Sequence, residues 1–344
     1  RKARLHDAEV RADHVGLLAH RRDLVAQRRR RRAQEADQVA DETGGVGRAL
    51  FERVAGRLGA GVLFCDDVTE RDVPDDCPFV VVLKPVQWGR SGGFRGLLSL
   101  PGRIQVFGLW DDIHQGPKGT RTLSRDRWVL TRFFRRCDAI LCTSHDPFVQ
   151  WYPRYAAKLV HFPHFFRAAD FRAVPYNDAP IDRCILSGAV GRFYPVRKIA
   201  ARNPDVVTLR HPGYGDAPGR EVPGLFGEAY ARELSRYRCA VTCSAVTGYV
   251  VAKYMELPAA GCLLLATYTS DLDRLGFEDG VTYVRVDEGS FDGKLAEVLA
   301  APGAFERIRR AGFEMVRRRH SDDHRAEQLE QLDQPGLLAR RRGD

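Results

Sequence analysis

A lysine and a glutamate, Lys253 and Glu256, stand three residues apart in a segment that begins at Gly248. Side chains at this spacing share one face of a helix, which predicts an ammonium group beside a carboxylate. A loop leading into a helix, with these two charges near it, suits the phosphates and ribose hydroxyls of a nucleotide. A plain Lys–Glu pair on an exposed helix is the alternative. The candidate nucleotide-binding residues here are Thr247, Gly248, Tyr249, Lys253 and Glu256.

A second candidate is the loop Ser187–Lys198, which carries two glycines and three cations. Gly188 and Gly191 allow close approach of the backbone to a ligand. The loop is then expected to bind a diphosphate through backbone N–H groups and either Arg197 or Arg192, with Tyr194 in the same loop. The G-x-x-G spacing alone fits a second interpretation as well as it fits phosphate binding. In that interpretation the loop is a turn between a strand and a helix, and the basic residues of the first helical turn are solvated.

Two residues following the strand-like run 103–110 are candidates for proton transfer. Asp112 and His114 are two residues apart. At this spacing one side chain can act as a base while the other orients it. A metal site needs a third ligand that the loop does not offer, and a polar turn without chemistry is the alternative. His211 lies in a further turn, where a lone histidine is usually structural.

Composition limits the class of protein. The net charge is +9, and the basic ends at residues 1–45 and 335–344 supply about half of it. No zinc-finger spacing or RNP-type aromatic run accompanies this charge, so nucleic acid is not favoured as a partner, whereas contact with a membrane surface stays open. The eight cysteines form no C-x-x-C, which predicts free thiols in a reducing, cytoplasmic compartment and no bound metal. No apolar run is long enough to span a bilayer, and no signal peptide is recognisable.

Strand-like and helix-like runs alternate along most of the chain, which predicts an α/β protein with parallel sheets. Strands are expected at 61–65, 79–84, 103–110, 139–143 and 158–162, and again at 183–187, 205–210, 239–243, 262–266 and 281–286. The main helices are expected at 122–136, 148–157, 192–201, 226–237, 249–258, 290–300 and 304–331. Prolines in 163–182 indicate a linker between two lobes. The predicted divisions are a basic arm (1–45), a first Rossmann-like domain (46–165), a second (166–331) and a basic tail (332–344).

Several of these segments occur in an order that resembles the GT-B glycosyltransferases, particularly the bacterial group related to spore-maturation glycosyltransferases. The pattern K-x-x-E-x-x-x-x-G is matched by Lys253, Glu256 and Gly261. The other matching segments are 136–144, 159–163, 187–197 and 312–325, the last like the family's terminal "G…H-T-Y…R". Together they cover about residues 130–330.

The resemblance implies two Rossmann-like domains facing across a cleft, with a nucleoside-diphosphate sugar held mainly by the second. It implies sugar transfer without an obligatory metal or other cofactor, to an acceptor that the sequence does not identify. By position, Glu256 corresponds to the family carboxylate that holds the ribose, and Arg197 to the cation near the diphosphate. The catalytic assignment of Asp112 and His114 rests on their loop alone.

This sequence departs from the family pattern at three places. Position 248 is glycine where many relatives have the first glutamate of an E-x7-E pair. Pro258 stands two residues after Glu256, where it is expected to kink the helix. The first domain is short and is preceded by the arginine-rich arm. A non-catalytic sugar-nucleotide or glycan-binding relative is therefore the second hypothesis, and an adaptor acting through the arm is the third.

Overall fold

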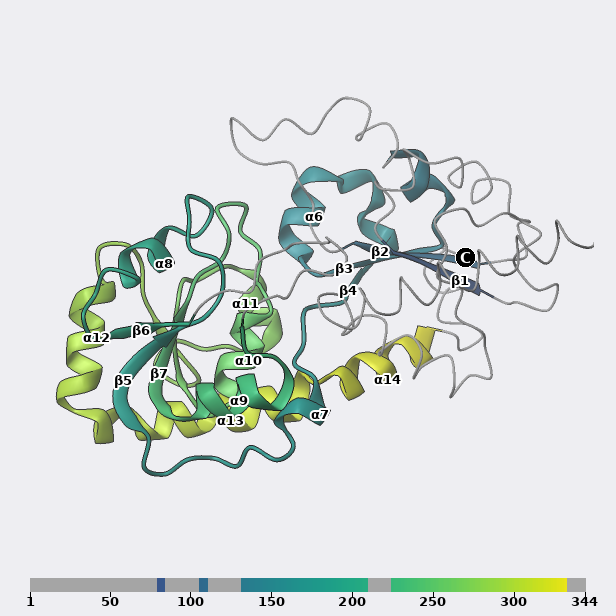
Figure 1. Ribbon diagram of the computed structural model, residues 1–344. Helices are drawn as coiled ribbons and strands as arrows, with labels where there is room; N and C mark the ends of the chain where they lie inside the picture. Colours follow the sequence, from purple (N-terminus) through teal and green to yellow (C-terminus); the bar gives the residue numbers. More distant parts are fainter. Residues whose placement is uncertain (1–78, 84–104, 111–130, 210–223, 333–344) are drawn as a thin grey trace, which may run out of the picture. The chain divides into compact units, whose positions relative to one another are not determined.

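The computed structural model describes residues 79–83, 105–110, 131–209 and 224–332, which Figure 1 draws in colour. The chain divides into two compact units, and all the described residues belong to the one formed by Leu50–Gly213 and Pro223–Asp344. Several predictions concern residues outside the described ones: the basic arm, the strand at 61–65, Asp112, His114, His211 and the tail beyond Leu332.

The first sheet is parallel, as predicted, and its strands have the order β1-β2-β3-β4. Its strands are Phe79–Leu83, Gln105–Trp110, Ala139–Cys142 and Leu159–His161. A glycine is needed in the second strand because the Phe133 ring, from the helical run 131–136, packs directly on it. A Cβ added at Gly108 would lie 2.5 Å from Phe133 Cε1. The register pairs Gly108 with Ile140 of β3.

Two helical pieces join β3 to β4, where one helix over 148–157 was predicted. Helix α6 runs from His145 to Trp151, and a 3-10 helix, η2, follows from Pro153 to Lys158. Proline cannot donate the backbone hydrogen bond that a continuous helix requires, so the chain begins a new helix at Pro153. Aromatic rings hold both pieces: Phe134 packs against Phe148, Tyr152 and Tyr155 at centroid distances of 5.0–5.5 Å.

The second sheet is also parallel, with the order β6-β5-β7-β8-β9. The strands are β5 (Ile181–Leu186), β6 (Val206–Thr208), β7 (Tyr237–Thr242), β8 (Leu263–Ala266) and β9 (Val284–Arg285). Only two residues of the strand predicted at 281–286 pair in the sheet. Because β6 and β7 lie on opposite sides of β5, the winding direction reverses between β5 and β7. In open α/β sheets, ligands bind outside the carboxyl ends of strands at such a point.

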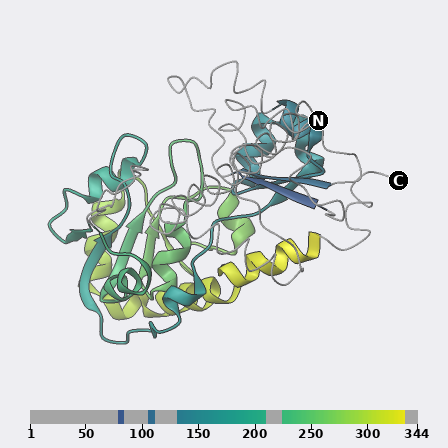
Figure 2. The ribbon, with the colours of Figure 1, turned by 45° about the vertical axis from the view of Figure 1, so that its right-hand side comes forward.

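Both faces of this sheet are covered by helices, as parallel sheets require. On one face, Leu186 and Leu263 pack with helices α8 (Pro195–Ala200) and α12 (Phe291–Ala300). On the other, Ile185 and Leu264 pack with α9 (Gly227–Ser235), α10 (Lys253–Ala259) and α13 (Glu306–Arg319). The second half of β5, Cys184–Leu186, and all of β8 are therefore buried, whereas the first three residues of β5 are exposed. Figures 1 and 2 show the layers.

Helix α10 differs in detail from the prediction of a helix over 249–258. It begins at Lys253 and passes through Pro258 to end at Ala259. Pro258 lies in the last turn, so the helix ends just beyond it. Gly261 then adopts a left-handed conformation with φ 87°, which confirms that Ala259–Gly261 ends the helix.

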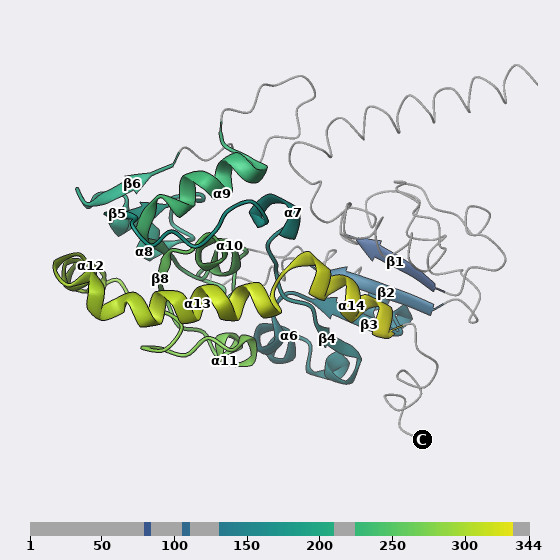
Figure 3. The same ribbon diagram turned by 90° about the horizontal axis from the view of Figure 1, so that it is seen from below.

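The C-terminal helix predicted over 304–331 is two helices, α13 and α14 (Asp322–Leu332), preceded by a 3-10 turn, Pro302–Phe305. The break is stabilised by the linker, where Phe166 exchanges backbone hydrogen bonds with His320 and Asp322. Figure 3 shows α13 continuing into α14 at this break. Two short helices complete the described part: α7 (Ala168–Phe171) and α11 (Asp271–Leu275).

Two further observations concern the described part of the chain. Its six cysteines are all buried and free. None of its helices is both long and apolar enough to cross a membrane.

Candidate nucleotide-binding site

The predicted site residues gather at the carboxyl edge of the second sheet. Ser187 and Gly188 follow β5, and Cys243 and Ser244 follow β7, so the two loops flank the point where the winding reverses. Helix α10 follows the second loop along the chain. The topology therefore places the two glycine-containing loops at the edge where α/β sheets bind ligands.

Lys253 and Glu256 meet on one face of α10, as their spacing predicts. The Lys253 ammonium lies 2.5 Å from Glu256 Oε2. Both side chains are about four-fifths buried, with exposed fractions of 22% and 21%. Burial opposes the charge on Lys253, but Glu256 and Tyr230 more than offset it, and the pKa of Lys253 is raised. Lys253 therefore carries its positive charge at neutral pH.

Tyr230, from helix α9, completes a network that the sequence did not indicate. Its hydroxyl lies 3.2 Å from Glu256 Oε2, 2.9 Å from Lys253 Nζ and 2.8 Å from Ser187 Oγ. Burial raises the pKa of Tyr230 to about 12, so the hydroxyl keeps its proton. All these contacts to Glu256 use Oε2. Among the described residues, none bonds to Oε1, which leaves one carboxylate oxygen for a ligand.

Arg197 is buried rather than presented on the surface, with an exposed fraction of 2%. Its guanidinium donates to Thr242 Oγ1 at 2.8 Å and to the Ala189 carbonyl at 3.3 Å, and it stacks on the Tyr194 ring. The side chain thus fills the space between the ends of β5 and β7. Its charge lies beneath the Gly188 loop, so Arg197 supports this loop from below and is not a free cation at its surface.

Gly188 is required at this position for two reasons. Its φ of 110° lies in the region that side-chain-bearing residues avoid. An added Cβ would also lie 2.6 Å from Arg197 Nη1. The sequence analysis gave Gly191 the same role as Gly188, but no atom lies within 4 Å of a Cβ added at Gly191. The two glycines of the G-x-x-G spacing are therefore not equivalent.

A cavity of about 490 Å³ opens at the carboxyl ends of β7, β8 and β9, beside the first turn of α8. Gly188, Arg197 and Glu256 are not among its lining residues. Among its lining residues are Thr247 and Gly248 after β7, Thr269 after β8 and Asp287 after β9. The Thr247 and Thr269 hydroxyls are buried without a hydrogen-bond partner in the described part of the chain. Gly248 has a φ of 84°, and Tyr249 is buried against the Trp151 ring. Of the predicted residues in this loop, Thr247 and Gly248 line the cavity and Tyr249 packs beside α6.

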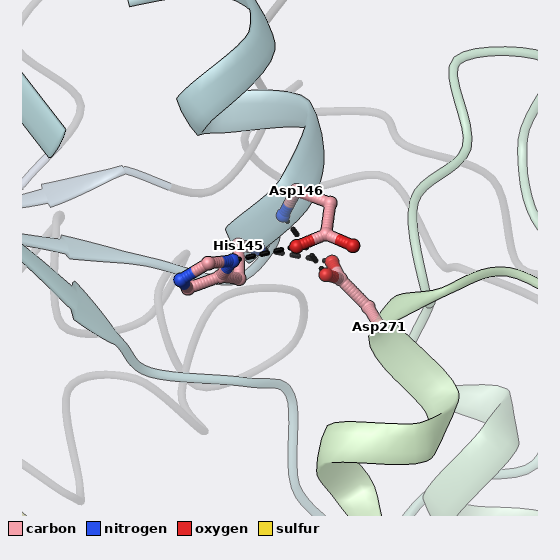
Figure 4. Close-up of side chains that lie close together, drawn as sticks. All are labelled: His145, Asp146 and Asp271. Carbon is pink, nitrogen blue, oxygen red and sulfur yellow. Dashed lines mark hydrogen bonds and ion pairs between the residues drawn. The ribbon is translucent and has the colours of Figure 1, made fainter. Parts of the chain in front are cut away.

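The same cavity is lined by two aspartates that fix the start of α6. The Asp271 carboxylate accepts the backbone N–H groups of His145 and Asp146, each at 2.9 Å. Figure 4 shows Asp271 reaching from α11 to the first turn of α6, where His145 Nδ1 lies 2.7 Å from Asp146 Oδ1. These three side chains form a group with metal-ligating atoms, but their contacts show an N-terminal cap of α6.

The pKa values of the two aspartates move in opposite directions. Burial raises the pKa of Asp271, although its two N–H donors act against the shift. Hydrogen bonds from Ser270 and His145, with the charge of Arg274, lower the pKa of Asp146. Asp146 is thus the more firmly ionised member of the group.

The structure brings Gly188, Tyr194 and Arg197 together at the β5 end, and Lys253 with Glu256 on α10. Asp112 and His114 lie outside the described residues, so their roles in proton transfer stay predictions. Tyr230 and Asp271 were missed because their partners lie 26 and 126 residues away along the chain. A signal for Asp271 was present in its position soon after β8, but only the tertiary structure reveals the backbone groups that it caps.

Comparisons with known proteins agree with this architecture. Residues 195–331 match a family model described as "Glycosyl transferase-like". No curated protein sequence matches the chain. The fold is similar to sucrose-phosphate synthase from Thermosynechococcus elongatus, with a TM-score of 0.56 and 17% identity over 74% of this chain and 72% of the other.

Two further solved structures are similar in fold. HepE of Anabaena, in complex with UDP-glucose, has a TM-score of 0.54 and 12% identity over 74% of this chain and 78% of the other. An α-glucosyltransferase in complex with UDP-glucose and DNA has a TM-score of 0.51 and 12% identity over 76% and 81%. The chain therefore has the GT-B fold of glycosyltransferases, and its residues 195–331 match the glycosyl transferase-like family.

Proposed function

We propose that the protein transfers a sugar from a nucleoside-diphosphate sugar to an acceptor, with the nucleotide bound at the carboxyl edge of the second sheet. The observation that carries this proposal is the state of Glu256. Lys253 and Tyr230 hold Oε2, while Oε1 is left without a bond from the described residues. A carboxylate fixed in this way can accept both hydroxyls of a ribose.

The diphosphate is proposed to lie against the loops that begin at Gly188 and Gly248. Both glycines adopt positive φ values, which allow a backbone to approach phosphate oxygens closely. Arg197 contributes positive charge from beneath the first loop. In a site of low dielectric, such a charge stabilises the negative charge that develops on the leaving diphosphate.

The proposed division of the chain keeps donor binding in residues 166–331 and assigns the acceptor side to residues 46–165. Asp112 and His114 are proposed to act there in proton transfer, and the acceptor is unidentified. We propose a cytoplasmic enzyme, which agrees with six buried free thiols. Transfer is proposed to need no metal. Retention of activity in excess EDTA supports that point, and loss that Mg²⁺ or Mn²⁺ restores contradicts it.

A ligand screen tests the donor proposal. The purified protein is heated with uridine, guanosine, thymidine and adenosine diphosphates and with their sugars, and UDP-glucose comes first because two fold relatives were solved with it. A ligand at 100 times its Kd stabilises the folded state by about 2.7 kcal/mol. One nucleotide class should raise the Tm selectively. An unchanged Tm with all of them contradicts the proposal.

A non-catalytic nucleotide-binding relative is the second candidate, and one observation favours it. Position 248 is a glycine at φ 84°, a conformation that a glutamate adopts only with strain, so the loop is not built for the first acid of an E-x7-E pair. The two candidates differ in turnover. A binding protein is stabilised by the nucleotide yet releases no nucleoside diphosphate from the sugar donor with any acceptor mixture.

A further inference from the structure

A second cavity, of about 400 Å³, shares no residue with the first and has a different chemistry. It lies where the end of β4, helix α11 and the α13–α14 break come together. Three arginines line it, Arg274, Arg319 and Arg325, against a single acid, Glu327. Arg274 is already paired with Asp146, at 3.3 Å, so Arg319 and Arg325 carry the excess positive charge. The cavity is therefore cationic, and its arginines suit an anion.

Arg325 is the buried member of this set, with an exposed fraction of 7%. Its guanidinium donates to Gln328 Oε1, to the Arg319 carbonyl and to His320 Nδ1. None of these acceptors is charged, and its Nε is buried without a partner in the described part of the chain. Burying a cation without a counter-charge is costly, and burial accordingly lowers the pKa of Arg325 to about 10. An anion in the cavity supplies the missing charge.

His320 cannot supply or remove that charge. Its Nε2 lies 2.8 Å from the Leu275 carbonyl, which can only accept, so Nε2 carries the proton. Its Nδ1 then accepts a hydrogen bond from Arg325 Nη2 at 2.9 Å. Both contacts together require a neutral imidazole in one tautomer. His320 therefore orients Arg325 and adds no charge to the cavity.

His161 offers the opposite kind of group, an acceptor. Burial lowers the pKa of His161 to about 4, so its ring is neutral at neutral pH. A hydrogen bond to the Thr143 backbone acts against the shift, as donation to a carbonyl does. The neutral ring therefore keeps its proton on Nδ1. Its Nε2 is buried without a partner among the described residues and is left with a free lone pair. The cavity thus combines unpaired N–H donors with one unpaired acceptor.

We propose that this second cavity binds a terminal phosphate group at a site separate from the donor site. The charged oxygens of the phosphate accept from Arg319 and from Arg325 Nε. At neutral pH inorganic phosphate always carries at least one P–OH, whereas a phosphomonoester, with a second pKa of about 6, carries one for part of the time. This hydroxyl donates to His161 Nε2. Sulfate has the same shape and no such proton, so it leaves His161 Nε2 unsatisfied. The assignment also accounts for the segment 312–325, whose His320 and Arg325 have no place at the donor site.

The test measures binding of inorganic phosphate, glycerol 3-phosphate and sulfate to the full-length protein by isothermal titration calorimetry at constant ionic strength. We expect saturable phosphate binding that is about tenfold or more tighter than sulfate binding. The tighter of the two phosphate probes identifies the source as free phosphate or a phosphomonoester. Absent or unsaturable phosphate binding overturns the proposal, as does equal affinity for sulfate.

Matched variants locate the site. Arg319 and Arg318 are both exposed on the last turn of α13, and only Arg319 lines the cavity. Arg319→Gln should weaken phosphate binding by about tenfold, while Arg318→Gln should change it less than twofold. His161→Leu should reduce the preference for phosphate over sulfate. Equal effects of the two arginine variants contradict the assignment. The Glu256→Gln variant should bind phosphate normally, which separates this site from the proposed donor site.

Discussion

Replacement of Gly188 by alanine tests whether Arg197 is locked beneath its loop. The new methyl group would lie 2.6 Å from Arg197 Nη1 in a residue held at φ 110°. The backbone strain costs about 1–3 kcal/mol. The guanidinium must also move, which weakens its bonds to Thr242 and Ala189. A hydrogen bond from a charged group contributes about 1.5–3 kcal/mol, so the free energy of unfolding should fall by about 2.5–6 kcal/mol in total.

A double-mutant cycle separates the two costs. In an Arg197→Met background the methyl group no longer meets a fixed guanidinium, so Gly188→Ala should cost only the backbone strain of about 1–3 kcal/mol. Gly191→Ala is the matched control, because nothing lies within 4 Å of its added Cβ, and it should change stability by less than about 1 kcal/mol. Urea denaturation followed by circular dichroism gives the values. Equal costs of Gly188→Ala in both backgrounds would refute the packing of Arg197 described above.

Two further predictions concern stability. In helix α13 the Cβ of an alanine at Gly312 would clash with the Thr282 carbonyl oxygen, so Gly312→Ala should destabilise the protein by about 1–3 kcal/mol. An alanine at Gly293 in α12 meets no neighbouring atom, so Gly293→Ala should stabilise the protein by about 0.5–1 kcal/mol. Equal effects of these two variants in urea denaturation would contradict the packing of α13. Burial lowers the pKa values of His320 and His161 to about 4 from 6.5, so the folded state favours the neutral rings. Their contribution to stability is complete above pH 6.5 and is lost as the pH falls toward 4, so the Tm should drop over that window and drop less in His320→Gln. A Tm that rises between pH 6.5 and 5, or an equal drop in the variant, would be inconsistent with buried neutral rings.

Local patterns predicted the sheets well. The apolar run Cys184–Leu186 reads as a strand buried on both faces, and in the structure its residues alternate between the two helix layers. The spacing of Lys253 and Glu256 was sufficient to predict their ion pair, because three residues on a helix fix their geometry. Turn chemistry likewise placed the end of α10 at Gly261.

Features that depend on tertiary contacts were not predictable. Nothing near Glu256 in the sequence indicates that Tyr230 holds the same oxygen, since α9 reaches it only through the packing of the sheet. Arg197 looks like a surface cation in a glycine-rich loop, and only the fold shows that β7 provides Thr242 to bury it. The cap that Asp271 places on α6 depends on residues 126 positions apart.

The central claim, that Glu256 holds a bound nucleotide, is tested most directly by matched glutamine variants. Glu256 and Glu297 each pair with a lysine three residues earlier, at 2.5 and 2.7 Å, but Glu297 lies on the exposed face of α12. Titration calorimetry with the nucleoside diphosphate selected by the screen should show about 10- to 100-fold weaker binding for Glu256→Gln and unchanged binding for Glu297→Gln. Equal affinity in the wild type and Glu256→Gln, with both folded, would contradict the assignment of the site.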